Sequence, residues 1–248
     1  MRPYLLLDAG WTLLFPDYRV IRQIIVQNGY DVSEERLERL MAEFVRDFDE
    51  RLRNNGQADF DLFEWVLERA GVDKQHIPSI VSQLLARDAE KSLWTYTYPW
   101  VYETLANLSG QGYRMSVISN ADGHVAQELD YVGLVRYFEE IFDSHLVGYA
   151  KPDPRLFEHA LKTLKLHPAE CLYVGDVYYV DVLGANQVGI AALHLDRYGL
   201  YDGWPGYHIP TVAALPDFLA QNPDLHDERF FPLRPEKVAE SLRRHSSG

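Results

Sequence analysis

Short apolar or alternating runs that end in polar residues recur along this chain of 248 residues. The first run covers residues 4–7, is apolar throughout and ends at Asp8. This pattern predicts a strand buried on both faces, as in a parallel sheet. Three later runs of the same kind predict strands over residues 113–119, 171–175 and 190–195.

Segments with helical spacing separate these strands. Apolar residues recur at that spacing over residues 101–108, 124–132, 154–164 and 180–188, where we expect helices. Alternating strands and helices favour right-handed crossovers and therefore a parallel sheet. The expected fold class is α/β, with a doubly wound, Rossmann-like core.

Residues 16–93 have no strand signal, and their apolar positions follow helical spacing. Ser33 is expected to cap one of these helices, and Pro78 to open another. We therefore expect an all-helical domain over residues 16–93, inserted into the α/β core after its first strand.

The expected boundaries follow from this division. The core comprises residues 1–15 and 94–225 and is interrupted by the helical insertion. Residues 226–248 form a charged, proline-marked tail. We expect this tail to be partly disordered, above all at residues 243–248.

The charge balance argues against several partners. The chain has 37 acidic and 24 basic residues, for a net charge of -13. Such a surface repels the phosphates of nucleic acids and of anionic membranes, so we expect neither as a partner. A phosphate bound here needs a local positive group, either a metal ion or a placed lysine.

Composition and local sequence add further expectations. The hydrophobic content of 47% is enough for a full core. The single cysteine, Cys171, excludes an intrachain disulfide and agrees with a cytoplasmic location. The apolar start, residues 5–7, is too short for a membrane span or a signal peptide. We expect a monomer or a homodimer, for which the aromatic-rich segment 198–207 offers a contact surface.

Chemically useful side chains follow the predicted strands. In an open parallel sheet, ligands bind at the carboxyl ends of the strands. Asp8 and Thr12 follow the first strand, and Ser119 ends the second. Lys151 precedes a helix, while Asp176 follows the strand 171–175 and Asp181 starts the next helix. We expect these residues to meet at one edge of the sheet.

This set suits phosphoryl transfer through a covalent aspartyl intermediate. Asp8 is the expected nucleophile, and Asp8 and Asp176 are expected to hold Mg²⁺, which prefers oxygen ligands. Lys151 supplies a positive charge to the transferring oxygens. Thr12 and Ser119 donate hydrogen bonds to the same oxygens, and Asp181 acts from the second ligand shell. The substrate would be a small phosphorylated metabolite.

The four motifs resemble those of the haloacid dehalogenase superfamily. The family pattern is an apolar strand ending in Asp-x-Asp-x-Thr, a strand ending in Ser or Thr, a Lys, and Gly-Asp-x-x-x-x-Asp. The matches are Asp8 with Thr12, Ser119, Lys151, and Gly175-Asp176 with Asp181. The resemblance implies a hydrolase in which residues 16–93 are a helical, C1-type cap. It also implies that the backbone carbonyl of residue 10 binds the magnesium ion.

The chain departs from the pattern at Gly10, where family phosphatases have a second Asp. That carboxyl protonates the leaving oxygen, and losing a general acid costs on the order of 10²–10⁴ in rate. Three interpretations remain open: a good leaving group such as an acyl phosphate, a proton donor in the cap, or binding without turnover. Trp11 also replaces the usual small residue.

A metal-independent dehalogenase is an alternative, because the dehalogenase branch also lacks this second Asp. That branch has a small hydroxyl residue at the place of Asp176, which argues against dehalogenation here. A catalytically inactive binding protein is the other alternative.

Other candidates have simpler roles. The nine histidines give no spaced pair on a helical face, so no zinc site is expected. His124 and His194 are interpreted as structural, and Tyr201 and Trp204 as packing residues. Tyr178 and Tyr179 follow the Asp176 motif, and shaping of the pocket and simple packing stay equally open for both.

Overall fold

The computed structural model describes residues 2–55 and 60–233. The chain divides into two compact units. One unit comprises Met1–Leu14 and Thr97–Gly248, and the other comprises Phe15–Tyr96. The second unit therefore interrupts the first in sequence, directly after the loop that follows the first strand.

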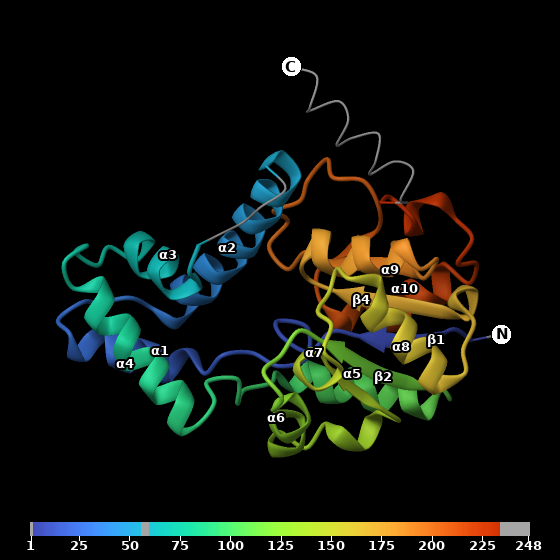
Figure 1. Cartoon of the computed structure of the whole chain (residues 1–248), viewed down its shortest axis with the longest axis horizontal. Helices are drawn as coiled ribbons and strands as arrows, with labels where there is room; N and C mark the ends of the chain where they lie inside the picture. Colours follow the sequence, from blue (N-terminus) through green and yellow to red (C-terminus); the bar gives the residue numbers. More distant parts are fainter. Residues whose placement is uncertain (1, 56–59, 234–248) are drawn as a thin grey trace. The chain divides into compact units, whose positions relative to one another are not determined.

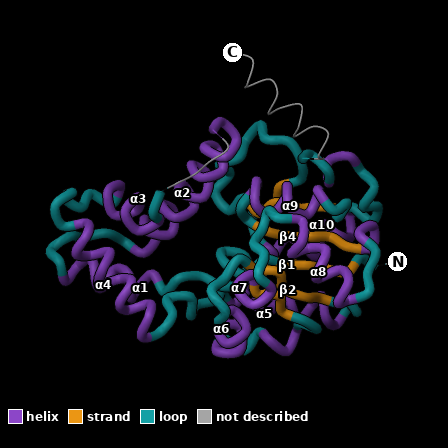
Figure 2. Tube along the Cα trace, in the orientation of Figure 1, coloured by secondary structure: helices purple, strands orange, loops and turns teal. Residues whose placement is uncertain are grey.

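The first unit is built on one six-stranded, fully parallel sheet (Figure 2). The strand order is β3-β2-β1-β4-β5-β6, so β1 and β4 lie at the centre. The α/β, Rossmann-like fold class is confirmed. The strands are β1 Tyr4–Leu7, β2 Met115–Ser119, β3 Ile141–Asp143, β4 Cys171–Gly175, β5 Ala191–Leu195 and β6 His208–Ile209.

The four strands expected from the sequence are present, and β3 and β6 add to them. These two strands have three and two residues, which is too short to leave an apolar period in the sequence. All four residues of β1 are buried, as expected for a central parallel strand.

Helices surround the sheet (Figure 1). Asp153 is the N-cap of α8 (Pro154–Leu164), and its side chain accepts a hydrogen bond from Arg155 N. Leu156 and Phe157 of α8 pack with Leu6 and Tyr173 of the sheet in one buried cluster. The helices of this unit are α5 Pro99–Gly110, α6 Val125–Tyr131, α7 Ser144–Val147, α8 Pro154–Leu164, α9 Leu183–Gln187 and α10 Leu215–Gln221.

The second unit is helical in its described part, and a single bridge pairs Phe15 with Tyr96. Ser33 caps its longest helix, because the Ser33 hydroxyl accepts from Arg36 N at 3.1 Å. An aromatic group around Phe44 and Trp65 joins α2 to α3. The helices are α1 Tyr18–Gln27, α2 Glu34–Asn55, α3 Leu62–Arg69 and α4 Ile77–Glu90.

Residues 226–233 pack against the rest of the first unit. Phe230 is fully buried and touches Tyr207 and Phe218. The buried Asn186 amide donates to the Phe230 carbonyl at 3.0 Å. This part of the expected tail is therefore ordered, whereas residues 243–248, where disorder is expected, lie outside the described residues. Among the described helices, none has the length and apolar content needed to cross a membrane.

We expect Gly184→Ala to destabilise the first unit by about 1–3 kcal/mol, because an added methyl overpacks the core. A Cβ on Gly184 would lie 2.4 Å from the buried Phe157 ring and 3.3 Å from the Pro152 Cα. Chemical denaturation measures the loss. Adding Phe157→Leu should make the two losses less than additive.

Gly110→Ala is the matched control, because nothing lies within 4 Å of its added Cβ. It should leave stability unchanged or slightly higher. An equal loss in both variants would show that close packing at Gly184 is not the cause.

Candidate active site

The loop after β1 places Asp8 at the carboxyl edge of the sheet. The Asp8 amide donates to the Val174 carbonyl of β4 at 2.9 Å, which continues the strand pairing to the catalytic candidate. The chain then turns tightly, because the amides of Leu13 and Leu14 both donate to the Ala9 carbonyl at 2.8 Å. Trp11 takes a positive φ of 49° in this turn.

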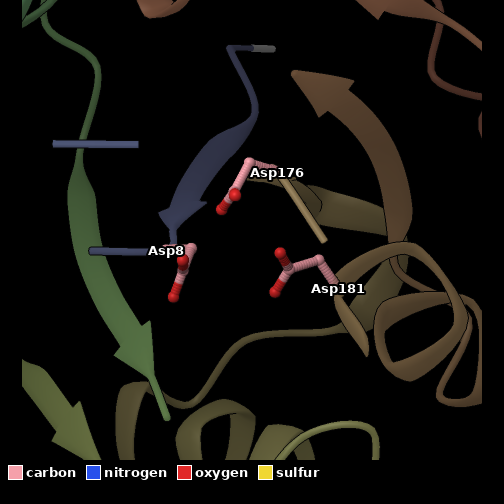
Figure 3. A group of neighbouring side chains, drawn as sticks. All are labelled: Asp8, Asp176 and Asp181. Carbon is pink, nitrogen blue, oxygen red and sulfur yellow. The ribbon is translucent and has the colours of Figure 1, made fainter. Parts of the chain in front are cut away.

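Three carboxylates converge at this edge (Figure 3). Asp8 follows β1, Asp176 follows β4, and Asp181 comes from the π-helical turn Tyr178–Val182 that leads into α9. One carboxylate oxygen of each lies within 4.8 Å of those of the other two. All three side chains are buried. Figure 3 shows the carboxylates facing a common space.

Lys151 partly neutralises this group. Its ammonium donates to Asp8 Oδ1 at 2.6 Å, to Asp181 Oδ1 at 2.7 Å and to the Tyr173 hydroxyl at 2.8 Å. Burial opposes the charged form, but the Asp181 and Asp8 carboxylates outweigh burial and raise the pKa of Lys151. Lys151 is therefore an ammonium with all three N–H bonds directed at oxygen.

Asp8 has an unusual protonation equilibrium. Burial raises the pKa of Asp8 to about 6, while Lys151 opposes the rise and Asp181 adds to it. A carboxyl with a pKa in this range is ionised at neutral pH and can act as a nucleophile.

The backbone of Lys151 is held by the loop after β2. The Asn120 side chain accepts from Lys151 N at 2.7 Å and donates to the Lys151 carbonyl at 2.9 Å. Asn120 directly follows Ser119, which is 4% exposed at the end of β2. This pair of hydrogen bonds joins the Ser119 and Lys151 segments.

Asp181 serves as an anchor. Its Oδ1 accepts from Lys151, and its Oδ2 accepts from Val177 N at 2.9 Å. A Cβ on Gly175 would lie 2.4 Å from Asp181 Oδ2, so only glycine allows this approach at the end of β4. Both Asp181 oxygens are thus engaged by protein donors.

The sequence-predicted residues lie at the ends of β1, β2 and β4 and in the segments that follow them. Thr12 is fully buried, and its hydroxyl has no hydrogen-bond partner within the described residues. The Gly10 carbonyl accepts from Thr12 N at 2.6 Å. An unpartnered buried hydroxyl is costly unless a ligand satisfies it.

The donor set fits a magnesium ion. Three buried carboxylates with one compensating ammonium leave a net negative charge, and Mg²⁺ takes oxygen ligands of this kind. Lys151 contacts Asp8 through Oδ1 and not through Oδ2. The carboxylates of Asp8 and Asp176 face a common space (Figure 3).

A family comparison decides the assignment. Residues 11–189 match the family described as haloacid dehalogenase-like hydrolase. The chain belongs to the haloacid dehalogenase-like hydrolases. The expected superfamily membership and hydrolase class are confirmed.

Several relatives of this hydrolase are phosphatases by name. It is 31% identical to the glyceraldehyde 3-phosphate phosphatase of Methanopyrus kandleri, over 67% of this chain and 69% of the relative. It is 31% identical to phosphoglycolate phosphatase 1 of Pseudomonas aeruginosa, over 59% and 54%. It is also 34% identical to the bovine haloacid dehalogenase-like hydrolase domain-containing protein 3, over 52% of each. The chain thus spans about half the length of the latter two.

Solved structures share the fold. The HAD-hydrolase YfnB of Bacillus subtilis, solved with bound magnesium, matches with a TM-score of 0.60 at 18% identity, over 89% of this chain and all of YfnB. A 2-haloacid dehalogenase of Pseudomonas syringae matches with a TM-score of 0.53 at 24% identity, over 89% and 99%. A magnesium-bound hydrolase and a 2-haloacid dehalogenase thus share this fold, and the fold alone does not identify the reaction of this chain.

Two site residues of the hydrolase escaped the sequence-based expectations. Tyr173 lies within β4, and its hydroxyl accepts from Lys151 and lies 3.0 Å from the Ile118 carbonyl and 3.1 Å from Asp181 Oδ1. Asn120 fixes Lys151, as described above. A tyrosine inside an otherwise apolar strand was the available signal for the first, and no pattern marks the second.

The exposure of the other aromatic and histidine candidates indicates their roles. Tyr201 and Trp204 are 5% and 8% exposed and pack with Tyr178, which confirms their packing role. These two residues are therefore core residues and not part of the contact surface expected for segment 198–207. His194 is buried and hydrogen-bonded, whereas His124 is largely exposed and pairs with Asp122.

We expect the raised pKa of Asp8 to appear in the stability of the metal-free protein. The folded pKa is about 6 and the ordinary value 3.8, so the carboxyl favours folding below about pH 4. That contribution is lost as the pH rises through about 6. Melting temperatures in chelator should therefore fall for the wild type relative to Asp8→Asn over this range, and run parallel above about pH 7. A constant difference across the whole range would contradict a raised pKa.

Proposed function

We propose that this hydrolase is a magnesium-dependent phosphohydrolase of a small phosphorylated metabolite, with Asp8 as nucleophile. The observation that carries the proposal is the convergence of Asp8, Asp176 and Asp181 around one space, with Lys151 bonded to two of them. The phosphatase names of several relatives support the same reaction class.

Asp8, Asp176 and the Gly10 backbone carbonyl would hold the magnesium ion. Asp181 would support these ligands without binding the ion itself, because its two carboxylate oxygens already accept hydrogen bonds from Lys151 and from Val177 N. When bound, the ion neutralises part of the charge on the phosphoryl oxygens and holds the phosphoryl group in line with the nucleophile.

The first step forms an aspartyl phosphate. A carboxylate oxygen of Asp8 attacks phosphorus, the bond from phosphorus to the ester oxygen breaks, and its electron pair stays on the leaving oxygen. Thr12 and Ser119 donate to the transferring oxygens, and Thr12 is suited to this because its buried hydroxyl lacks a partner. Lys151 can donate there only by exchanging one of its three present contacts.

The second step returns the enzyme to its starting state. Water attacks phosphorus, the bond to Asp8 breaks, and inorganic phosphate leaves with the carboxylate restored. Asp181 and Tyr173 keep Lys151 in place throughout, because both contact its ammonium independently of Asp8.

Gly10 limits the substrate range. It has no side chain that can protonate a leaving oxygen, so the site favours substrates whose leaving group needs no proton, such as acyl phosphates. A proton donor from the unit Phe15–Tyr96 would widen this range. We propose that this unit is the cap domain of the hydrolase and that it selects the substrate.

Dehalogenation is the second candidate, because a halide leaves without a proton and Gly10 would then be no handicap. Asp176 weighs against it, since a third buried carboxylate repels the carboxylate of a 2-halo acid unless a cation is bound. Labelled water separates the two: single turnover in H₂¹⁸O puts label into phosphate for an aspartyl phosphate, but into Asp8 for an alkyl ester.

The remaining proposals concern the binding partners and the cellular location of the protein. The net charge of -13 supports a small-molecule substrate and disfavours nucleic acid or an anionic membrane as a partner. The lone Cys171 is consistent with a cytosolic location.

We expect Asp8→Asn to lower magnesium-dependent phosphate release by on the order of 10⁴-fold or more, because the amide is not a nucleophile. Release is measured over a panel of phosphorylated metabolites that includes acyl phosphates, with and without chelator. Asp217→Asn, an exposed aspartate of α10, is the isosteric control and should keep full activity. Activity that survives in Asp8→Asn would exclude Asp8 as the nucleophile.

We expect Gly10→Asp to raise turnover of substrates with poor leaving groups, such as alkyl phosphates, by up to about 10²–10⁴-fold. Acyl phosphates should gain much less, because their leaving group needs no proton. Gly10→Asn has the same size without the acid and should give no gain. If Gly10→Asp and Gly10→Asn give the same turnover of alkyl phosphates, a carboxyl at position 10 does not act as the general acid.

A further inference from the structure

A histidine on the neighbouring strand contacts the backbone of Asp176. His194 lies on β5, where it pairs in register with Gly175, and is 1% exposed. Its Nε2 lies 2.9 Å from the Asp176 carbonyl oxygen. A carbonyl only accepts, so His194 carries its proton on Nε2 and donates it to Asp176.

The same peptide group is held on its other side. The peptide that follows Asp176 has its carbonyl bonded to His194 and its N–H, that of Val177, bonded to Asp181 Oδ2 at 2.9 Å. Two hydrogen bonds from opposite directions fix the orientation of this peptide plane. Because the plane begins at the Asp176 Cα, it also limits the directions that the Asp176 side chain can take.

His194 is itself fixed by a second histidine. Its Nδ1 lies 2.9 Å from Nδ1 of His208, the first residue of β6, so a hydrogen bond joins the two rings. The other ring nitrogen of His208 lies 3.1 Å from the Trp204 carbonyl.

Aromatic rings pack around this histidine pair. The Tyr178 ring lies 5.3 Å from the His194 ring and stacks on His208 at 6.0 Å between centroids. The Tyr178 hydroxyl donates to the Pro205 carbonyl at 2.6 Å. Tyr178 belongs to the turn that carries Asp181, so the segment 204–208 is tied to both carboxylate-bearing loops.

We propose that His194 is a positioning residue: by holding the Asp176 carbonyl, it sets the direction of the Asp176 carboxylate toward the magnesium ion, and His208 keeps it oriented. The proposal rests on the proposed function of Asp176 as a metal ligand. His194 does not touch substrate or metal in this arrangement and acts through the Asp176 backbone.

Magnesium binding to the substrate-free protein, measured by isothermal titration calorimetry with MgCl₂ alone, tests the proposal. His194→Leu removes the donor and should weaken Mg²⁺ binding about 10–100-fold, the usual effect of losing a group that orients a ligand. His194→Gln keeps an amide donor at similar reach and should restore affinity to within a few-fold of the wild type. His194→Asn is too short to reach the carbonyl and should resemble Leu.

Tyr4→Phe is the matched control, because the buried Tyr4 hydroxyl bonds Ser116 at the other end of the same sheet. It should lose stability in a thermal melt but bind Mg²⁺ like the wild type. If His194→Leu does not fold, the comparison of Gln with Asn carries the test. A folded His194→Leu or His194→Asn with wild-type affinity would overturn the positioning role.

The proposed function fails by a different result in the same experiment. A wild type that binds no Mg²⁺, or an Asp176→Asn variant that binds it as tightly as the wild type, would remove Asp176 as a ligand. In that case the His194 variants would show no trend in Mg²⁺ affinity. If the wild type binds Mg²⁺ and the Asp176→Asn variant does not, the comparison of the His194 variants decides the positioning role.

Discussion

The buried ammonium of Lys151 is the interaction on which the rest of the site depends. It lies 2.6 Å from Asp8 and 2.7 Å from Asp181, with both carboxylates almost inaccessible to solvent. Breaking a buried ion pair by removing one partner costs about 3–5 kcal/mol, because a charge is left uncompensated. Without this cation, three carboxylates from three separate segments would repel one another, and the loops that carry them would not close on one space.

The sheet explains how such distant residues meet. Asp8 and Asp176 follow neighbouring central strands, so parallel pairing alone brings them to one edge. This part could be predicted, because a strand ending in a polar residue leaves a clear sequence pattern. The same reasoning applies to Ser119, whose strand pairs with the other side of β1. Asp181 followed from its place at the start of the next helical segment.

The supporting contacts could not be predicted, because they depend on register and on side-chain reach. The contact of Tyr173 with Lys151 depends on the register of β4, which pairs Tyr173 with Leu6 of β1. His194 contacts Asp176 only because β5 pairs it with Gly175. Neither residue is marked by periodicity, and the short strands β3 and β6 are too brief to be recognised by pattern. The sequence pattern therefore identifies the candidate site residues, whereas the pairing of strands determines which neighbouring side chains contact them.

Gly10 is the position at which the site departs from the phosphatase pattern described above. The site keeps the nucleophile, the carboxylates and the lysine but has no acid at the second position of the first motif. A structure described as a HAD phosphatase and one described as a 2-haloacid dehalogenase both share the fold, so our proposal depends on Asp176, a third buried carboxylate, and on Gly10, which provides no proton. Together they support our proposal of phosphoryl transfer from a leaving group that departs readily.

The account is tested most directly by a crystal structure of the protein with MgCl₂ and beryllium fluoride, which bonds to a reactive carboxylate as a mimic of an aspartyl phosphate. The account predicts beryllium bonded to a carboxylate oxygen of Asp8, with magnesium between Asp8 and Asp176 and with Lys151 still bonded to Asp181. Beryllium or magnesium bound elsewhere, or an Asp8 that stays unmodified while magnesium occupies the site, would contradict it.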